Sequence, residues 1–256
     1  MKREVLERGA FEGVANIVRF NWPFYAGAMI AAGTALALTR HPGLPRWAAG
    51  SLRLGAGAAA WMLGASLAAS HWIYDRSPLY RWRWLRGALP REPSRIVNVH
   101  AGFDESTAAL RVLWPAADLA VLDFYDPRRS PERSIARARW QQAPARDTRR
   151  IDPAHWPVAD ASADLVLLCL AVHELRGAAD RAAFFREVAR VLATNGRAVL
   201  VEHLRDLPNF AAFGPGFLHF LPRTAWLEGL EAGGLIVERE FSITPFVRAF
   251  LLTSPP

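Results

Sequence analysis

The sequence is poor in cysteine, because Cys169 is the only one among 256 residues. A single thiol excludes an internal disulfide framework. Its place in an apolar run favours a buried thiol over a reactive one. The sequence also lacks an internal repeat, so a solenoid is excluded.

Two motifs of nucleotide and metal chemistry are missing as well. The fingerprint G-x-G-x-x-G is absent. Without its glycines, backbone amides cannot approach a pyrophosphate, which argues against a bound dinucleotide. A metal site of His100, Asp104, His173 and His203 can be imagined, but no H-x-x-x-H or Cys-His spacing supports it, so we predict no metal.

The formal net charge of +7 comes entirely from the first 94 residues. This part holds 12 of the 31 Lys and Arg residues and 5 of the 24 acidic residues, so the remainder is neutral. A nucleic-acid-binding domain needs a basic face, so this distribution favours an anionic membrane surface as partner, with no nucleic acid. Within the neutral part we expect a solvated arginine-rich helix and loop, with an anionic lipid contact as the alternative. Its residues are Arg128, Arg129, Arg133, Arg137, Arg139, Arg146, Arg149 and Arg150.

Two long uncharged runs occupy residues 20–39 and 54–74. Each is long enough to cross a bilayer core of about 30 Å at about 1.5 Å per helical residue. The linker between them is short and contains Pro and Gly, so we predict two antiparallel transmembrane helices, at about 22–39 and 54–74. Small residues at four-residue spacing allow the two backbones to approach closely. They are Gly27, Ala31 and Ala35 in the first run and Ala60, Gly64 and Ala68 in the second.

Aromatic and basic residues flank this predicted hairpin. Trp22 and Tyr25 begin the first helix, and Trp72 and Tyr74 end the second, as expected for one membrane interface. Four basic residues precede the first helix and five follow the second before residue 94, against three in the linker. This bias places both termini and the second domain on the cytoplasmic side of the inner membrane. The alternatives are a cleaved signal peptide, which the acidic leader fits poorly, and Ala-rich helices buried in a soluble protein.

From residue 95 onward, apolar runs alternate with helical stretches. We predict strands at 96–99, 119–122, 165–170, 198–201, 235–237 and 246–252. We predict helices at 106–113, 134–140, 180–192 and 224–232. Such alternation is typical of an α/β protein with a doubly wound, mostly parallel sheet that binds ligands at the carboxyl ends of its strands. The chain therefore divides into a membrane anchor, 1–94, and an α/β domain, 95–256.

The most informative segment runs from Asp152 to Asp164 and continues into the apolar run 165–172. It resembles the D-A-x-x-L-P-F-x-D-x-S-F-D-L-V segment of class I S-adenosylmethionine (SAM) methyltransferases. The resemblance covers residues 95–256 and implies that family's Rossmann-like fold, a seven-stranded sheet whose last two strands form an antiparallel edge. It also implies that Asp152 contacts the adenine of the cofactor and that Asp164 opens the fourth strand.

The predicted first turn departs from the family pattern V-L-D-V-G-x-G-T-G. Gly102 alone keeps its glycine, whereas Asn98 replaces the usual acid, His100 the first glycine and Phe103 a small residue. SAM carries no phosphate, so a bulkier turn harms its binding less than the binding of a dinucleotide. We expect the methionine end of SAM to meet helix-start amides and one of the acids at positions 104 and 105.

Asp123 lies 21 residues after Gly102, close to the distance at which an acid ending the second strand reaches a ribose. One carboxylate matches two vicinal hydroxyls, so the resemblance gives Asp123 the ribose and places Phe124 beside the adenine. The alternative for Asp123 is a cap of the turn that follows it. The full set of predicted cofactor-binding residues is Asn98, His100, Ala101, Gly102, Phe103, Asp123, Phe124, Asp152, Pro153 and Cys169.

Segment 191–202 resembles the family's V-L-K-P-G-G-R-L-V-L-V-E. We predict that Asn195 and Gly196 form the turn between a helix and the fifth strand, where glycine allows a positive φ. This match supports the fold and carries no chemistry.

His173 and Glu174 follow the predicted fourth strand, where the family places residues near the methyl acceptor. Methyl transfer from a sulfonium is an in-line displacement that needs a base only if the acceptor holds a proton. We assign His173 an acid/base or acceptor-orienting role beside Glu174, and the alternatives are that His173 fills space and Glu174 begins a helix. His203 ends the fifth strand at the same edge, and His219 lies in an apolar segment that can cover the substrate.

These features predict a membrane-anchored SAM-dependent methyltransferase of small molecules, similar to the quinone and sterol methyltransferases. The predicted anchor favours a lipophilic acceptor, such as a quinone, an isoprenoid or another lipid. An enzyme with a water-soluble acceptor has no need of a membrane anchor. One alternative is a non-catalytic descendant of the fold that binds lipid or a protein partner, which the altered turn supports. Another is a membrane-bound NAD-dependent reductase, which the missing glycines disfavour.

Overall fold

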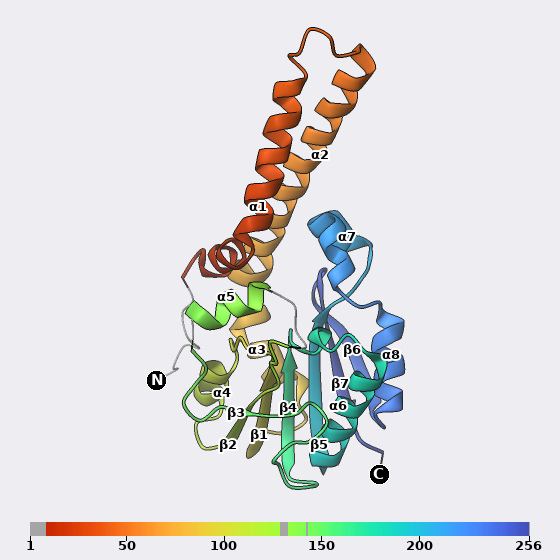
Figure 1. Ribbon diagram of the computed structural model, residues 1–256. Coiled ribbons are helices and arrows are strands. Elements are labelled where there is room, and N and C mark those ends of the chain that lie inside the picture. Colours follow the sequence, from red (N-terminus) through yellow and green to blue (C-terminus); the bar gives the residue numbers. More distant parts are fainter. Residues whose placement is uncertain (1–8, 129–132, 142, 256) are drawn as a thin grey trace.

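The computed structural model describes residues 9–128, 133–141 and 143–255, and it consists of an α/β domain with a helical hairpin standing on it (Figure 1). The hairpin is formed by α1 (Glu12–Leu38) and α2 (Arg46–His71). It rises from the edge of the domain at which the parallel strands end, and the C-terminal end of the chain lies at the opposite edge.

The domain is built on a seven-stranded sheet. Its strands are β1 (Arg95–His100), β2 (Asp118–Asp123), β3 (Arg149–Arg150), β4 (Ala163–Cys169), β5 (Leu192–His203), β6 (Ile236–Thr244) and β7 (Val247–Thr253). Their order is β3-β2-β1-β4-β5-β7-β6, and neighbours are parallel except for the β5–β7 and β7–β6 pairs. This confirms the predicted mostly parallel sheet with an antiparallel edge. The strand order reverses between β1 and β4, the point at which open α/β sheets bind ligands.

Helices and short helical turns connect these strands. The helices are α3 (Arg83–Ala88), α4 (Thr107–Leu113), α5 (Arg133–Gln141), α6 (Ala178–Val191), α7 (Leu207–Phe213) and α8 (Arg223–Ala232). The shorter elements are the π-helix η1 (Trp72–Arg76) and the 3₁₀ turns η2 (Leu79–Arg81), η3 (Val172–Glu174) and η4 (Gly214–His219).

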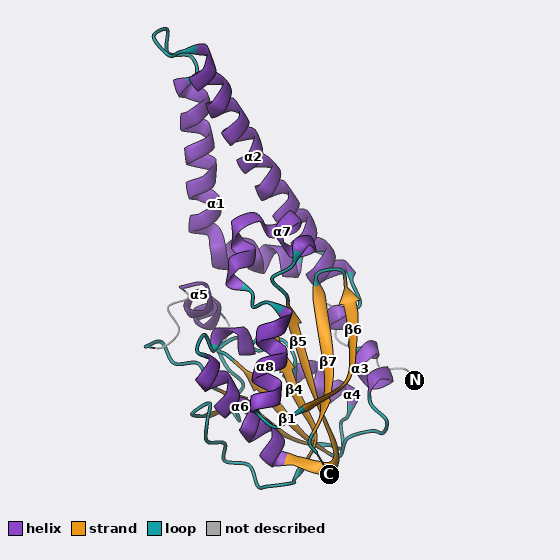
Figure 2. Ribbon diagram, turned by 90° about the vertical axis from the view of Figure 1, so that its right-hand side faces the viewer, coloured by secondary structure: helices purple, strands orange, loops and turns teal. Residues whose placement is uncertain are grey.

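Each face of the sheet carries its own hydrophobic core, because successive strand residues point to opposite sides. On one face, Val166 of β4 and Leu200 of β5 pack with Phe184 of α6 and Trp226 of α8. Figure 2 shows α6 and α8 together over this face. All four side chains are fully buried.

The second face is covered partly by residues that precede the predicted domain boundary. Leu79, Trp82 and Leu85 are fully buried in the same cluster as Leu165 of β4 and Leu110 of α4. The hydrophobic core therefore continues across residue 94, where the sequence analysis places the end of the membrane anchor.

The hairpin helices run antiparallel, and α2 begins earlier than predicted. Residues 46–53, predicted as linker, form its first two turns. The first helix bends at Asn21, whose backbone is not helical, because Pro23 disturbs the hydrogen bonding of this turn. Among the described residues, one helical segment, Arg46–Arg81, is long and apolar enough by length and composition to cross a membrane.

The predicted turn at Asn195 and Gly196 is wrong. β5 begins at Leu192 and runs through both residues, and Gly196 does not have a positive φ. Glycine is required there for another reason, since a Cβ would lie 2.5 Å from the carbonyl oxygen of Ala163 on the adjacent β4. The predicted start of the fourth strand is confirmed, because Asp164 is the second residue of β4.

Candidate functional site

A cavity of about 490 Å³ lies between the carboxyl edge of the sheet and the base of the hairpin. This volume is within the usual range of small-molecule sites, about 300–1,000 Å³. Its sheet side is formed by the turn after β1, with His100 and Phe103, and by the chain that leaves β4, with Cys169 and His173.

Residues of the hairpin close the cavity on its other side. Phe20 and Tyr25 from α1 and Ser66 from α2 line it. The Tyr25 hydroxyl and Ser66 Oγ share a hydrogen bond of 3.2 Å that joins the two helices. The ring of Phe20 meets the ring of Phe103 edge to face, with centroids 5.2 Å apart. The hairpin therefore forms a wall of the cavity as well as a projection from the domain.

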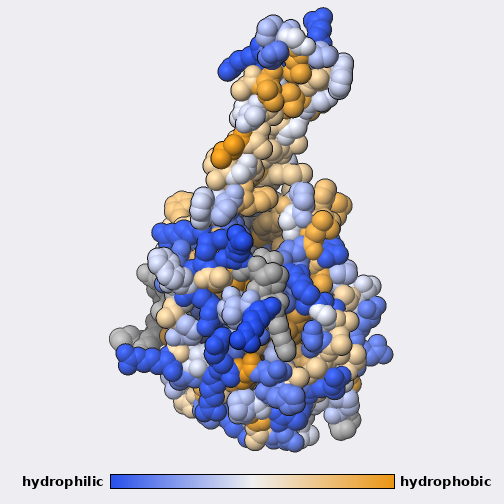
Figure 3. Space-filling model, viewed as in Figure 1, coloured by the Kyte–Doolittle hydropathy of each residue, from blue (hydrophilic) through white to orange (hydrophobic). Residues whose placement is uncertain are grey.

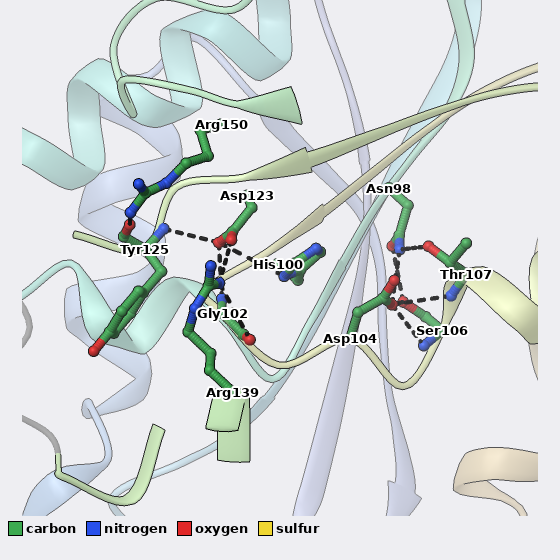
Figure 4. Close-up of polar contacts among 10 residues, drawn as sticks. All are labelled: Asn98, His100, Gly102, Asp104, Ser106, Thr107, Asp123, Tyr125, Arg139 and Arg150. Atoms are coloured by element: carbon green, nitrogen blue, oxygen red, sulfur yellow. Dashed lines mark hydrogen bonds and ion pairs between the residues drawn. The ribbon is translucent and has the colours of Figure 1, made fainter. Parts of the chain in front are cut away.

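The turn after β1 is organised by Asp104, as Figure 4 shows. Its Oδ1 accepts hydrogen bonds from the backbone N–H groups of Ser106 and Thr107, each at 3.0 Å, and from Asn98 Nδ2 at 3.3 Å. Burial raises the pKa of Asp104, but the nearby His100 and the bonds from Thr107 and Ser106 outweigh this and lower it. Asp104 is thus an ionised cap of the helix start, and Asn98 supports it from the buried strand.

His100 is the buried polar side chain that faces the cavity without a hydrogen-bond partner. It is 2% exposed, and neither ring nitrogen makes a hydrogen bond to the described residues. The carboxylate oxygen Asp123 Oδ1 lies 3.7 Å from its Nδ1. Burial lowers the pKa of His100 despite the charges of Asp104 and Asp123. We conclude that His100 is a neutral imidazole able to bond a ligand in the cavity.

Asp123 ends β2, and its carboxylate is fully engaged. Oδ1 accepts from the backbone N–H groups of Gly102 and Tyr125, each at 2.9 Å. Oδ2 binds the guanidinium of Arg139 from α5, and that guanidinium also lies over the ring of Tyr125, 5.0 Å from its centroid (Figure 4). The side chain of Asp123 has no exposed surface.

Gly102 allows α5 to lie against this turn. Its φ is +90°, a conformation that favours glycine, and a Cβ would lie 2.9 Å from Ile135 and 3.1 Å from the Arg139 side chain. Two further α5 residues, Ser134 and Ala138, line the cavity. Helix α5 thus covers the position at which the sequence analysis places the ribose.

The chain that leaves β4 brings His173 to the cavity. Leu170 has a φ of +51°, a rare conformation for a branched residue, and it begins the sharp turn into η3. His173 Nδ1 then donates to Glu202 Oε2 at 2.8 Å, while Glu202 Oε1 accepts from the backbone N–H groups of Val172 and His173. Glu202 therefore fixes both the ring and the backbone of His173.

Two carboxylates flank the His173 ring and determine its charge. Its Nε2 lies 3.3 Å from Glu174 Oε1, and Glu174 Oε1 lies 3.5 Å from His219 Nε2. Burial lowers the pKa of His173, but the charge of Glu202 and the bonds to Glu174 and Glu202 outweigh it and raise this pKa to about 10. The pKa of Glu174 falls to about 2, because the two histidines overcome the opposing effect of burial. His173 is consequently an imidazolium at neutral pH.

These three residues also form a cluster that the sequence analysis did not anticipate. The ligand atoms of His173, Glu174 and His219 lie within 4.8 Å of one another, close enough to hold a metal ion. A cation already lies beside them, because Arg176 donates to the carbonyl oxygen of His219 and its Nη2 lies 3.0 Å from His219 Nε2. We therefore describe the cluster as a charged hydrogen-bond network.

A second buried histidine is paired with Tyr74 of η1, the short helix that follows the hairpin. His203 Nδ1 donates to the carbonyl oxygen of Phe246 at 2.9 Å, so its Nε2 accepts from the Tyr74 hydroxyl at 2.9 Å. Burial lowers the pKa of His203 to about 4, against the charge of Glu202. This neutral histidine supports Tyr74, which lines the cavity.

Half of the predicted site residues meet at the cavity. They are His100, Ala101, Phe103, Cys169, His173 and Glu174. Gly102 and Asp123 lie directly behind this wall, and Asn98 supports the turn from within the sheet. Cys169 is partly exposed, so the expectation of a buried thiol is wrong.

The predicted adenine contacts lie outside the cavity. The carboxylate of Asp152 is half exposed and accepts from the backbone N–H of Ala154 at 2.8 Å. The carbonyl oxygen of Pro153 accepts from the indole N–H of Trp156. Phe124 is buried, with its ring edge to face against Phe184. Their contact with a cofactor stays a prediction.

Several cavity residues escaped the sequence analysis. Tyr80 and Trp82 line the cavity. The Tyr80 hydroxyl donates at 2.5 Å to Glu105 Oε2, an acid that the sequence analysis did name as a candidate contact of the methionine end. Glu202 and Arg139 fix His173 and Asp123 from distant parts of the sequence. The only sign of Tyr80 and Trp82 in the sequence was the run of Arg and aromatic residues after the second apolar segment. The sequence analysis interpreted this run as a membrane flank.

Comparison with known proteins gives one family match. Residues 110–200 match the family model described as a methyltransferase domain. No curated protein matches the chain in sequence. Among solved structures, a SAM-dependent methyltransferase from Aquifex aeolicus is 16% identical, with 70% of this chain and 94% of that chain covered and a TM-score of 0.49. An S-adenosylmethionine-dependent methyltransferase from Clostridium acetobutylicum is 9% identical, with 63% and 84% covered and a TM-score of 0.45.

The family match supports a methyltransferase enzyme. The resemblance described in the sequence implies S-adenosylmethionine as its cofactor. The cavity fits the charged end of this cofactor, since His100 offers ring nitrogens and the rings of Tyr80, Trp82 and Phe103 attract a sulfonium cation. When bound, the cofactor supplies a methyl group activated by its positive sulfur. The ribose contact of Asp123 stays a prediction, and it requires Arg139 to release the carboxylate.

Proposed function

We propose that the chain is a membrane-anchored SAM-dependent methyltransferase that acts on a small lipophilic acceptor, such as a quinone, an isoprenoid or another lipid. One observation carries the proposal: the same cavity is lined by the turn after β1 and by the base of the hairpin. His100 and Phe103 line it from the sheet, and Phe20 and Tyr25 line it from α1. An apolar acceptor held by the hairpin therefore lies next to the methyl donor.

The surface of the hairpin supports its insertion into a bilayer. Above its base, large apolar side chains point outward with at least about half of their surface exposed: Met29, Ile30, Leu36, Leu38, Leu54 and Trp61. Figure 3 shows this apolar surface along the hairpin above a mostly hydrophilic domain. Apolar surfaces of this extent mark membrane or protein contacts. Combined with the basic flanks, they favour two transmembrane helices and a domain on the cytoplasmic surface of the inner membrane.

The charged network at η3 is the part of the proposed site that binds and aligns the methyl acceptor. His173 is a cation held by Glu202, so it orients groups by donating and does not take a proton. Glu174 lines the cavity and can accept a hydrogen bond from the hydroxyl of an acceptor. In-line transfer depends on such alignment of the attacking atom with the methyl group.

The test uses the full chain in detergent or lipid nanodiscs. We would incubate it with isotope-labelled SAM and a lipid extract of the host cell, and then search by mass spectrometry for a lipid that has gained a labelled methyl group. Glu174→Gln should reduce the rate by about 100-fold, the loss expected when the reacting atoms are misplaced by about 1 Å. The matched control Glu231→Gln, on an exposed glutamate of α8, should leave the rate unchanged.

A calorimetric binding measurement can overturn the methyl-transfer proposal. If the full chain binds neither SAM nor S-adenosylhomocysteine by calorimetry, the methyl-transfer proposal is wrong. If the lipid extract gives no labelled product but a parallel water-soluble extract of the same cells does, the enzyme stands and its lipophilic acceptor does not.

The pairing of Arg139 with Asp123 favours a second candidate, a non-catalytic methyltransferase-fold protein that binds lipid or a protein partner at the membrane. In that case Arg139 fills the ribose position permanently. Lipid binding by the full chain without SAM-dependent methylation of any extract component would support this second function.

A further inference from the structure

Another uncharged segment lies beside the hairpin, in addition to the two predicted transmembrane runs. Residues 207–221, here called the α7 segment, comprise α7 and η4 and contain no Asp, Glu, Lys or Arg. Asp206 stands immediately before it, and Arg223 follows two residues after its end. The segment has five aromatic or imidazole rings, at Phe210, Phe213, Phe217, His219 and Phe220.

One face of the α7 segment exposes large apolar side chains. Leu207 is 76% exposed, Leu218 57% and Phe210 43%. The ring of Phe210 packs edge to face on Phe217, with centroids 5.0 Å apart, so the exposed face is continuous from α7 to η4. Figure 3 shows apolar surface at the place where Figure 1 draws α7.

The α7 segment is packed against the lower part of α2. Gly214 has a φ of +53°, and a Cβ there would lie 2.8 Å from Met62 Sδ. Both ribbon views place α7 next to the base of the hairpin (Figures 1 and 2). The exposed apolar face therefore adjoins the surface of the hairpin that we assign to the bilayer.

The opposite face of the same segment lines the cavity. Phe213, Gly216, His219 and Phe220 contribute to the cavity wall. Arg205 holds the segment in place by donating to the carbonyl oxygens of Leu218 and Phe220, at 2.7 and 2.8 Å. The α7 segment thus has lipid-like surface on one side and the candidate site on the other.

A second surface suited to lipid contact lies around α5 at the base of the hairpin. Trp22 and Trp140 are exposed there, and they border a shallow depression with Arg19 and Arg137. Exposed Trp and Arg together are typical of the level of lipid headgroups. These residues mark a membrane surface at the top of the domain, where the α7 segment also lies.

We infer that the α7 segment is a third membrane contact, with Leu207, Phe210 and Leu218 inserted among the acyl chains next to the hairpin. The inference rests on the membrane anchoring proposed above, and its occupant is the same lipid bilayer. The segment is too short and irregular to span a bilayer, so it lies in the interface, as amphipathic helices do. It then forms the partition between the acyl chains and the cavity, across which a lipophilic acceptor reaches His173 without crossing bulk water.

Single-cysteine labelling tests this inference in the full chain, because only Cys169 must first be replaced. In a Cys169→Ala background, Leu207→Cys and Leu218→Cys are each labelled with bimane. The proteins are reconstituted in vesicles of phosphatidylcholine and phosphatidylglycerol that contain a lipid with a nitroxide on its acyl chain. Ile30→Cys on α1 is the positive control. Ile236→Cys is the matched control, an exposed apolar residue that pairs with Thr253 near the C-terminal end of the chain, at the edge of the domain opposite the hairpin.

The expected result is strong nitroxide quenching at 207, 218 and 30 and none above the soluble background at 236. Quenching at 30 together with values at 207 and 218 no higher than at 236 overturns the inference and leaves the anchor intact. Absence of quenching at position 30 as well overturns both the anchor and the inference. Methyl transfer is not part of this readout, so a failure of the proposed reaction is recognised separately.

Discussion

Arg139 on α5 binds the carboxylate of Asp123 at the end of β2. The same carboxylate is the acceptor that the family resemblance assigns to the ribose of SAM. The second oxygen of Asp123 already accepts from two backbone N–H groups. If Asp123 binds the ribose, as the resemblance predicts, Arg139 and the ribose compete for one group, and cofactor binding then includes the displacement of a guanidinium.

This competition predicts that Arg139→Ala strengthens SAM binding. Removal of a charge-assisted bond worth about 1.5–3 kcal/mol should tighten the dissociation constant by about tenfold or more, measured by calorimetry on the full chain. Arg133→Ala, an exposed arginine of the same helix, should have no effect. A loss of affinity in Arg139→Ala as large as in Asp123→Asn would instead make Arg139 part of the binding site.

Asp152 offers a test of the sequence prediction that the structure leaves open. Half of its carboxylate surface is exposed, so an oxygen is accessible to the amino group of an adenine. Asp152→Ala should weaken SAM binding by about tenfold, the value of one hydrogen bond to a charged acceptor. Asp147→Ala, which also removes an exposed carboxylate, serves as the control. Unchanged affinity in Asp152→Ala would place the adenine elsewhere.

The charge of His173 predicts a pH dependence of stability. Its pKa rises from an ordinary 6.5 to about 10 in the folded protein, so the folded state binds the proton more tightly than the unfolded state. The resulting stabilisation is complete below pH 6.5 and is lost as the pH rises through the folded pKa, by at most about 1.4 kcal/mol per pH unit.

We expect the melting temperature of the full chain in detergent to fall between pH 7 and 10. The fall should be much smaller in His173→Gln, while His155→Gln should keep the wild-type slope. Equal slopes in all three proteins would show that His173 is not the titrating group.

Gly196 is predicted to be indispensable because of its neighbour on β4. In Gly196→Ala the new methyl group would meet the carbonyl oxygen of Ala163 at 2.5 Å, and separation of the strands should cost about 2–3 kcal/mol. The control is Gly87→Ala in α3, where the space is open and a gain of up to about 1 kcal/mol is expected. Thermal unfolding of the two variants measures the difference, and equal melting temperatures would contradict the prediction.

The sequence predicted the sheet well because each strand is a short apolar run between polar turns. The antiparallel edge was implied by the resemblance to the class I methyltransferases, whereas the strand order itself was not predicted. The two-residue strand β3 was not predicted, because neither Arg149 nor Arg150 is apolar. The turn at Gly196 was misassigned because a glycine required by strand packing looks the same as one required by a positive φ.

The site was predicted only in part, for a physical reason. Residues at strand ends, such as His100 and His173, converge because parallel strands end at one edge. No such rule predicts which side chains from other elements will bind these residues. The contacts of Glu202 with His173 and of Arg139 with Asp123 depend on tertiary packing. The contribution of Tyr25 and Ser66 was also hidden, because a pattern that indicates a membrane helix does not reveal which residues line a cavity.

The beginning of α1 is tied to the end of α2 by a single side chain. The Asp75 carboxylate accepts from the backbone N–H groups of Gly13 and Val14 and pairs with His71 at 2.9 Å, and its side chain has no exposed surface. A chimera that exchanges the hairpin for another anchor would leave this ion buried without its amides, at a cost of several kcal/mol. The hairpin and the α/β domain are thus not interchangeable modules. We expect a viable graft to carry residues 9–94 as one piece.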